Sequence, residues 1–418
     1  MRISTLSARQ ILILASSPQL VRGLHCWSKS PLYTINLQTS LDSLHEYAQC
    51  SLLNPTSPDS TPNAEEDYGP WSHAPVCTPL LQSINDTLCV YTDATFAHNR
   101  GISLFTTPTL AKKFASLPAF RNPSALTAQG INQPTHAYHA TSIPGKGIGM
   151  LASRPLKFGD RVTAYTPAFI AYLESELSTP DREAFWRVAI EQLPEALRSE
   201  FLSLATVYGD ERIRVQDVVK ANTFQVVLEG VNHLAVWPET SRLNHECAPN
   251  AQYAIDTDLL THVVRVTRPI AEGEEITIVY YSPLELTETR QQHLQHGFHF
   301  TCTCRRCTSP SSDAILREMK DLQDQLNNWS PESAGSPEMA EYLLTLYRDE
   351  GLEGFMDVGY GFAALAYSAV GDADKAKTYA EKAKEALLMK EGKWAPNLKM
   401  YDTLINDLKG HWSWRRRL

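Results

Sequence analysis

The sequence predicts an α+β protein that is rich in β-strands in its middle and helical at its C-terminal end. Two β-branched runs bounded by Gly and Pro, at 262–266 and 276–281, are typical of strands. Beyond residue 310 the pattern turns helical. With 418 residues, of which 43% are hydrophobic and 20% charged, the chain can bury two or three domain cores.

The other elements are predicted from the same periodicities, taken in chain order. Pro180 follows a hydroxyl residue that can cap a helix, and Pro194 interrupts the apolar pattern behind it, so two helices are expected over 180–206. A glycine turn is expected at 144–149. The expected strands are 88–91, 102–105, 138–143 and 161–169, and a short helix is expected over 109–117.

The N-terminal part has the composition of a targeting segment followed by an extension. No acidic residue precedes Asp42, and a short apolar run at 11–15 lies among Arg, Ser and Thr. Residues 1–23 therefore fit a weak signal peptide, equally a mitochondrial presequence, or an ordinary N-terminus. An N-terminal extension is expected over 24–134, with a linker rich in Pro, Ser and acid at 54–75.

Cysteine usage gives a second indication of compartment. Four cysteines, Cys26, Cys50, Cys77 and Cys89, lie in the first ninety residues, and their even number allows two disulfides. Asn85 and Asn328 begin glycosylation sequons. Both features favour the secretory pathway; buried free thiols would instead fit the cytoplasm or nucleus.

The other four cysteines have the spacing of a metal site. Cys302, Cys304 and Cys307 form a C-x-C-x2-C run, and Cys247 lies apart from them, beside the pair Asn244-His245. Three clustered thiolates and a distant fourth close a tetrahedral shell with no open position, which is typical of structural zinc. The sequence therefore predicts a zinc ion that pins the Asn-His pair to the later segment.

Three separated segments complete a pattern: GKGIGMLA (145–152), TSRLNHECAPNAQY (240–253), and GEEITIVYYS (273–282) leading into FHFTCTCRRC. In this order they resemble the SET-domain protein lysine methyltransferases, and most nearly the SMYD-like, fungal-type proteins with a split SET domain. The resemblance implies a β-rich, β-clip type SET fold over 135–285. It also implies a helical insert at about 170–235, a zinc-bound post-SET segment over 286–308 and a helical region over 309–418. Small residues between 360 and 388 resemble a tetratricopeptide-like (TPR-like) repeat.

The resemblance also implies S-adenosylmethionine as methyl donor and a protein lysine as acceptor. Tyr280 matches the tyrosine that faces the reacting nitrogen, and it is preferred over Tyr281 because it keeps the family's distance from Gly273. The implied cofactor-binding residues are Lys146, Gly147, Gly149, Asn244, His245, Tyr280, Phe298 and Phe300, and the implied zinc ligands are Cys247, Cys302, Cys304 and Cys307. Residue chemistry agrees with the role of Tyr280, because methyl transfer needs a neutral amine in line with the donor more than it needs acid–base help.

Two departures from the family pattern affect these expectations. Glu246 stands where the tetrad usually has serine, and a charge there is tolerable only if it points to solvent or is paired. No second Cys/His cluster lies within 150–240, so the inserted MYND zinc finger of SMYD proteins is missing. Two alternatives therefore stay open: an enzyme acting on a small molecule, and a non-catalytic interaction scaffold that uses the helical tail.

Composition bounds the partners. A net charge of −9 does not indicate direct nucleic-acid binding. The sequence contains no stretch of eighteen apolar residues, so no membrane-spanning helix is expected. A monomer that meets a lysine-bearing protein is expected. The basic end Arg415–Arg417 is expected to be a solvated, frayed tail.

Overall fold

The computed structural model describes residues 68–418, which form two compact units that alternate along the chain. The small unit consists of 68–132 and 166–238, and the large unit of 133–165 and 239–418. The expected targeting segment 1–23, Cys26, Cys50 and most of the linker at 54–75 lie outside the described residues. Within 68–418 no helix is long and apolar enough to cross a membrane.

The small unit is built on a six-stranded mixed sheet. Its order is β1-β2-β3-β7-β9-β8, in which only the β3–β7 pairing is parallel. The strands are β1 (Val76–Cys77), β2 (Cys89–Asp93), β3 (Ile102–Thr106), β7 (Phe169–Tyr172), β8 (Phe224–Leu228) and β9 (Val231–Val236). The insert expected to be helical thus begins and ends in strands, and it shares one sheet with the expected N-terminal extension.

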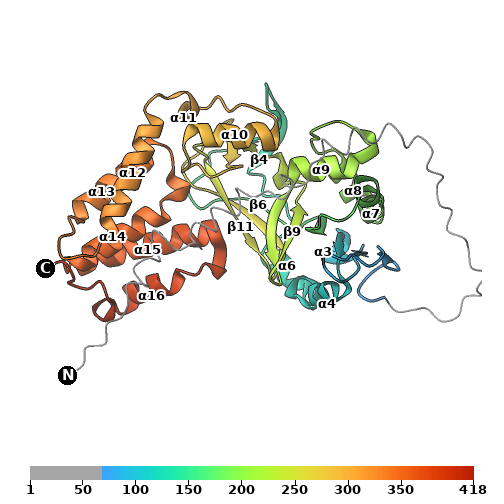
Figure 1. Ribbon diagram of the computed structural model, residues 1–418, viewed down its shortest axis with the longest axis horizontal. Helices are drawn as coiled ribbons and strands as arrows, with labels where there is room; N and C mark the ends of the chain where they lie inside the picture. The colour runs from blue at the N-terminus through green and yellow to red at the C-terminus, as the bar shows by residue number, and fades with distance from the viewer. Residues whose placement is uncertain (1–67) are drawn as a thin grey trace, which may run out of the picture. The chain divides into compact units, whose positions relative to one another are not determined.

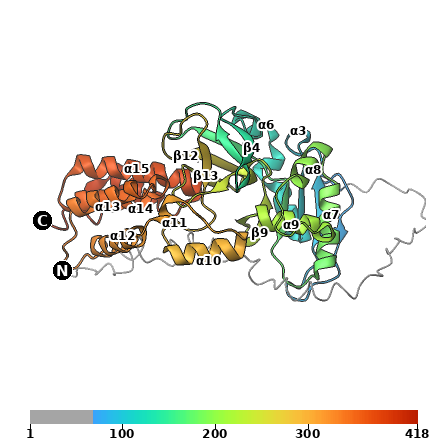
Figure 2. The ribbon, with the colours of Figure 1, turned by 90° about the horizontal axis from the view of Figure 1, so that it is seen from above.

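Helices pack around this sheet, and local signals set where several of them begin. Thr107 caps α4 with its side chain and Ser178 caps α7, each ahead of an early proline. Trp186 and Phe201 bury their rings against Phe169 of β7, and α7, α8 and α9 lie together in Figures 1 and 2. The helices are α3 (Phe96–Asn99), α4 (Pro108–Ser116), α5 (Pro118–Arg121), α6 (Pro123–Ala128), α7 (Thr179–Glu191), α8 (Glu195–Leu202) and α9 (Arg214–Asn222).

A disulfide joins the first two strands of the small unit. Cys77 of β1 and Cys89 of β2 are direct partners across the antiparallel pair, and their sulfurs are bonded. One of the disulfides that the cysteine count allows is therefore present. The cysteines predicted as zinc ligands are all free thiols and lie in the other unit.

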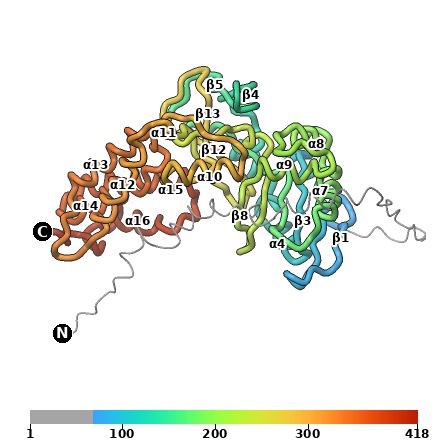
Figure 3. The backbone as a smooth tube through the Cα atoms, turned by 45° about the horizontal axis from the view of Figure 1, so that its top comes forward, coloured from blue at the N-terminus to red at the C-terminus, as the bar shows by residue number. Residues whose placement is uncertain are grey.

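The large unit holds two smaller sheets. One has the order β10-β13-β5-β4, and the other β11-β12-β6; Figure 3 shows β4, β5 and β13 side by side. The strands are β4 (Tyr138–Ile143), β5 (Gly147–Ala152), β6 (Arg161–Tyr165), β10 (Asn244–His245), β11 (Ala251–Asp256), β12 (Thr261–Val266) and β13 (Glu275–Ile278). The strand expected over 161–169 is two strands, β6 and β7, one in each unit.

The strand expected over 276–281 ends earlier, at Ile278. Tyr280 and Tyr281 follow in a bend. Because both tyrosines lie beyond the strand, the contacts of each ring show which of them faces the site.

The C-terminal region is helical, as predicted. α14 and α15 approach closely because small residues lie between them, among them the fully buried Ala363, Ala376 and Ala380; Figures 1 and 2 show the two helices side by side. α15 also contacts β11. The helices are α10 (Thr287–Phe298), α11 (Arg305–Thr308), α12 (Ser312–Leu326), α13 (Pro337–Asp349), α14 (Asp357–Ala369), α15 (Ala373–Glu391) and α16 (Leu398–Asn406).

The expectation of a frayed basic tail is wrong for Arg417. Its guanidinium lies 4.0 Å from the ring centroid of Trp329 and donates to the backbone oxygens of Gly335, Leu326 and Asn328. A cation over an indole that also meets carbonyl acceptors is held in place rather than freely solvated. The sequence hid this contact because its partners lie more than eighty residues away along the chain.

Candidate cofactor and metal site

Sheet pairing brings Asn244-His245 against the GEEITI segment. These two residues form β10, which pairs in parallel with β13 and sets Asn244 opposite Thr277 and His245 opposite Ile278. A Cβ added at Gly149 of the neighbouring β5 would lie 2.6 Å from the Asn244 side-chain nitrogen and 2.6 Å from Ile143. Only glycine fits at that approach. The predicted glycine turn and the Asn-His pair therefore belong to one site.

Glu275, which was not among the predicted site residues, connects two predicted cofactor residues. Glu275 Oε2 accepts a hydrogen bond from Lys146 Nζ at 2.6 Å, and Glu275 Oε1 accepts one from Asn244 Nδ2 at 2.9 Å. Gly147, which follows Lys146, has φ +76°, and an added Cβ would meet nothing within 4 Å. Glu275 stands in the GEE sequence, but no sequence pattern connects it with Asn244, 31 positions away, or with Lys146, 129 positions away.

His245 is held as a neutral imidazole with a fixed tautomer. Its Nδ1 lies 3.0 Å from the backbone nitrogen of Tyr280, which can only donate, so Nδ1 is the acceptor. The proton then lies on Nε2, which is 3.2 Å from the sulfur of Cys247. Burial lowers the pKa of His245 to about 3, which keeps the ring uncharged. One side chain thus connects the tyrosine segment to the cysteine cluster.

Tyr280 lies inside a cluster of aromatic rings. Its ring centroid is 4.8 Å from that of Phe298 and 5.4 Å from that of His245, and Phe300 lies 6.0 Å from His245. Between the two phenylalanines, His299 adopts the left-handed conformation, with φ 60°, and ends α10. This change in chain direction allows Phe298 and Phe300 to pack against Tyr280.

The two tyrosines have different surroundings. The Tyr280 hydroxyl donates to the backbone oxygen of Leu243 at 2.7 Å, and burial, followed by the charge of Glu275, raises the pKa of Tyr280 above its usual value. Tyr281 instead stacks on His293 with centroids 3.9 Å apart. The structure thus brings Tyr280 into contact with the Asn-His segment.

The four predicted metal ligands lie together. One sulfur from each of Cys247, Cys302, Cys304 and Cys307 falls within 4.8 Å of all the others. A tetrahedral zinc ion about 2.3 Å from each sulfur holds neighbouring sulfurs about 3.8 Å apart. The Cys247 sulfur is 4.0 Å from that of Cys302 and 3.5 Å from that of Cys307, so this four-sulfur set fits structural zinc.

Two buried arginines surround the cysteine cluster. Arg290 directs Nη2 at the Cys307 sulfur at 3.8 Å, and although burial opposes its charge, the neighbouring thiols raise its pKa above the usual value. Arg306 donates to the backbone oxygens of Cys247 and Pro283 and pairs with Glu350 at 2.8 Å. Four thiolates around Zn²⁺ carry a net charge of about −2, which such cations offset.

Glu246 has neither of the two environments expected for it, which were exposure to solvent and an ion pair. The side chain is half-buried, and burial followed by the charge of Cys304 raises the pKa of Glu246 to about 7. The residue neither points freely to solvent nor has an ion-pair partner among the described residues.

The Arg306–Glu350 pair gives a stability prediction. Both side chains are almost fully buried, at 0% and 4% exposure. Arg306→Met should lower the free energy of unfolding by about 3–5 kcal/mol, because it leaves the carboxylate of Glu350 buried without its cation. Arg305→Met is the matched control, since Arg305 is exposed and should cost less than about 1 kcal/mol.

Urea unfolding followed by tryptophan fluorescence measures both variants. The double variant Arg306→Met/Glu350→Gln should recover part of the loss, because it removes the unpaired charge as well. Equal destabilisation by Arg305→Met and Arg306→Met would contradict the assignment.

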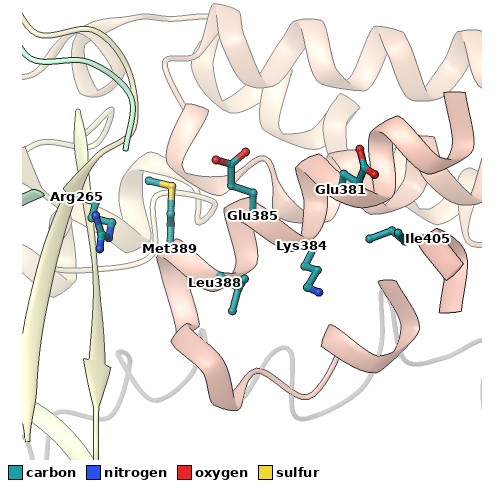
Figure 4. Close-up of a pocket in the computed structure, with 7 residues that line it drawn as sticks. All are labelled: Arg265, Glu381, Lys384, Glu385, Leu388, Met389 and Ile405. Carbon is teal, nitrogen blue, oxygen red and sulfur yellow. The ribbon is translucent and has the colours of Figure 1, made fainter. Parts of the chain in front are cut away.

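A cavity of about 510 Å³ opens elsewhere in the large unit. It is lined by Arg265 of β12 and by side chains of α15 and α16 (Figure 4). None of the predicted cofactor or metal residues lines it, so the site described above and this cavity are separate features.

Comparison with known proteins identifies the class of fold that carries the site. The family model of the SET domain matches residues 147–281, and the sheets of the large unit, its C-terminal helical region and the cysteine cluster agree with that match. Residues 147–281 therefore have the SET fold, as the motifs predicted.

Particular relatives are lysine methyltransferases by name. The chain is 33% identical over 108 residues to the N-lysine methyltransferase SMYD2 of Homo sapiens, a match covering 25% of this chain and 24% of the relative. It is 26% identical over 276 residues to the histone-lysine N-methyltransferase set5 of Schizosaccharomyces pombe, covering 62% of this chain and 80% of the relative. The match thus spans about a quarter of the length of SMYD2.

Among solved structures, a Plasmodium falciparum protein described as a histone methyltransferase matches over 34% of this chain and 92% of its own, with 14% identity. Its TM-score of 0.20 is too low to add to the fold assignment.

Proposed function

We propose that the protein is an S-adenosylmethionine-dependent N-methyltransferase that acts on lysine side chains of proteins. The observation that carries the proposal is the setting of Tyr280. Its hydroxyl is fixed on the Leu243 carbonyl, its ring packs with Phe298, and its backbone nitrogen holds His245. The relatives named above, which are lysine methyltransferases, support the same activity.

The chemistry of Tyr280 supports a positioning role rather than that of a base. Its raised pKa keeps the phenol protonated, and its proton is already donated to Leu243. The free lone pairs of the hydroxyl oxygen can accept from a substrate N–H and turn the amine toward the donor. An apolar aromatic setting disfavours the ammonium form, so the lysine would react as the neutral amine and release its proton to solvent.

When bound, S-adenosylmethionine would supply an electrophilic methyl group for the lysine nitrogen. Lys146, Gly147, Gly149, Asn244 and His245 would hold this cofactor, with the rings of Phe298 and Phe300 at its apolar edge. Open space above Gly147 and the close approach at Gly149 are consistent with a ligand that meets the backbone there.

Structural zinc would hold together the two segments that carry His245 and Phe300. Cys247 follows His245 by two residues, and Cys302 follows Phe300 by two. A zinc ion on all four sulfurs would therefore fix the spacing between the cofactor-binding pair and the aromatic ring. Its role is conformational, because the four thiolates leave no open coordination position for substrate.

We further infer that the substrate is met in an oxidising compartment. Disulfides persist in secretory compartments, and the Cys77–Cys89 bond in the small unit supports passage through one. Asn85, which begins a sequon, is exposed in the same segment. Mass spectrometry of the native protein without reduction should find the 77–89 bond and the mature N-terminus; free thiols at both positions would exclude this compartment.

Titration calorimetry with S-adenosylmethionine, followed by transfer of its labelled methyl group to a protein extract, tests the proposed activity. Binding together with label on lysine is the expected result. An intact fold that does not bind the cofactor would favour the scaffold alternative. Binding without any protein acceptor would favour a small-molecule substrate.

A further inference from the structure

Glu275 is not among the residues proposed to bind the cofactor or the substrate. Its carboxylate nevertheless contacts two of the predicted cofactor-binding residues. Its two carboxylate oxygens are used by different partners, Oε2 by Lys146 and Oε1 by Asn244. The side chain is 17% exposed, and a Cβ added at Gly149 would lie 3.1 Å from its Oε1. The carboxylate is thus packed against the glycine strand and has little freedom to move.

The chemistry of the carboxylate fixes how Asn244 faces the site. An ionised carboxylate can only accept hydrogen bonds, so the amide of Asn244 must turn its nitrogen toward Glu275. The amide oxygen then points away from Glu275 and is left as an acceptor. The same carboxylate draws the flexible Lys146 side chain, which is 40% exposed, to one position.

From this geometry we propose that Glu275 is a positioning residue of the cofactor site. It sets the orientation of the Asn244 amide and the position of the Lys146 ammonium before the cofactor arrives. The inference rests on the proposed function and extends it, because it states how two cofactor-binding side chains are preorganised by a third that does not itself bind the cofactor. Preorganisation of this kind raises affinity by removing the cost of ordering.

Glu275→Gln tests the proposal, because a glutamine has the same shape but no charge and only one acceptor oxygen. Its amide nitrogen can donate to the oxygen of Asn244 and so allows the asparagine to turn over. Calorimetry should show S-adenosylmethionine binding about tenfold more weakly than to the wild type. The KM for the cofactor should rise in step, and kcat at saturating cofactor should stay within about threefold, because the Tyr280 hydroxyl keeps its hydrogen bond to Leu243.

Glu274→Gln is the matched control. Glu274 is the preceding residue, and its carboxylate accepts hydrogen bonds from Arg268, the backbone nitrogen of Ala271 and Asn250 rather than from Lys146 or Asn244. This variant should lower thermal stability without changing cofactor affinity. A structural role for Glu275 would instead lower the folded fraction and kcat and leave the affinity of the folded molecules unchanged.

A double-mutant cycle makes the test specific. Lys146→Met and Glu275→Gln should weaken binding less together than the product of their separate effects, because one acts through the other. Multiplicative effects, or wild-type affinity in a folded Glu275→Gln, would overturn the proposal. If Glu275→Gln does not fold, Glu275→Asp replaces it: the shorter carboxylate cannot reach both partners, and undiminished affinity would overturn the proposal equally. A wild-type protein without affinity for the cofactor would overturn the proposed function instead.

Discussion

Cys247→Ser should release the metal and loosen the segment that carries Phe300. Cys247 is fully buried, its sulfur contacts those of Cys302 and Cys307, and His245 points Nε2 at it. A neutral serine hydroxyl is a poor zinc ligand, and structural zinc in small peptides contributes about 10–16 kcal/mol of apparent binding free energy. The zinc content should therefore fall from about one ion per chain to near zero.

Cofactor affinity should fall with the metal, by about tenfold or more, because Phe300 and His245 lose their common anchor. Metal analysis by mass spectrometry, thermal unfolding and calorimetry measure the three effects. Thr303→Ala is the matched control: it changes an exposed residue between two ligands and should retain both zinc and affinity. A Cys247→Ser protein that keeps one zinc ion per chain would refute the four-cysteine assignment.

Tyr280→Phe should slow methyl transfer strongly while leaving cofactor binding almost unchanged. The substitution keeps the ring in contact with Phe298 and His245 and removes only the hydroxyl. We expect the single-turnover rate to fall about 10²–10³-fold, the usual cost of deleting one preorganised polar group at a reacting centre. Stability should fall by about 1–2 kcal/mol, since the buried carbonyl of Leu243 loses its donor.

Tyr281→Phe is the comparison that isolates the effect. Tyr281 lies next in the chain, and its ring stacks on His293. Its single-turnover rate should stay within about fivefold of wild type. Equal loss in the two variants would mean that ring packing, rather than the Tyr280 hydroxyl, supports transfer, and an unchanged rate in Tyr280→Phe would remove this residue from the site.

Much of this molecule was predictable because its signals are local. The C-x-C-x2-C run, the glycine turn and the β-branched strands each lie within a few residues, and the SET fold and the cysteine cluster followed from them. The strands β8 and β9 of the insert were missed because the insert was expected to be helical: β8 pairs with β9 across Glu229-Gly230, and β9 pairs in turn with β7.

The site itself was only partly predictable. The expected residues converge, but the hydrogen-bond partners that orient them were not foreseen. Glu275 holds Lys146 across 129 positions of sequence, and Leu243 receives the Tyr280 hydroxyl across 37. Such contacts depend on how strands pair in the folded chain, and a single sequence carries no period or spacing that reports them.

The alternation of the two units along the chain sets the order in which the protein can mature during synthesis. Strands of the small unit are complete once residue 236 has been made, whereas the large unit has only β4, β5 and β6 at that stage. Those strands must wait for β10 to β13, and the last cysteine of the cluster is residue 307. We therefore expect the small unit to fold first, before the large unit can complete its sheets. A ribosome that stalls before residue 307 would carry a folded small unit with an unmade metal site, a state in which exposed thiols invite mispairing with the cysteines of the small unit.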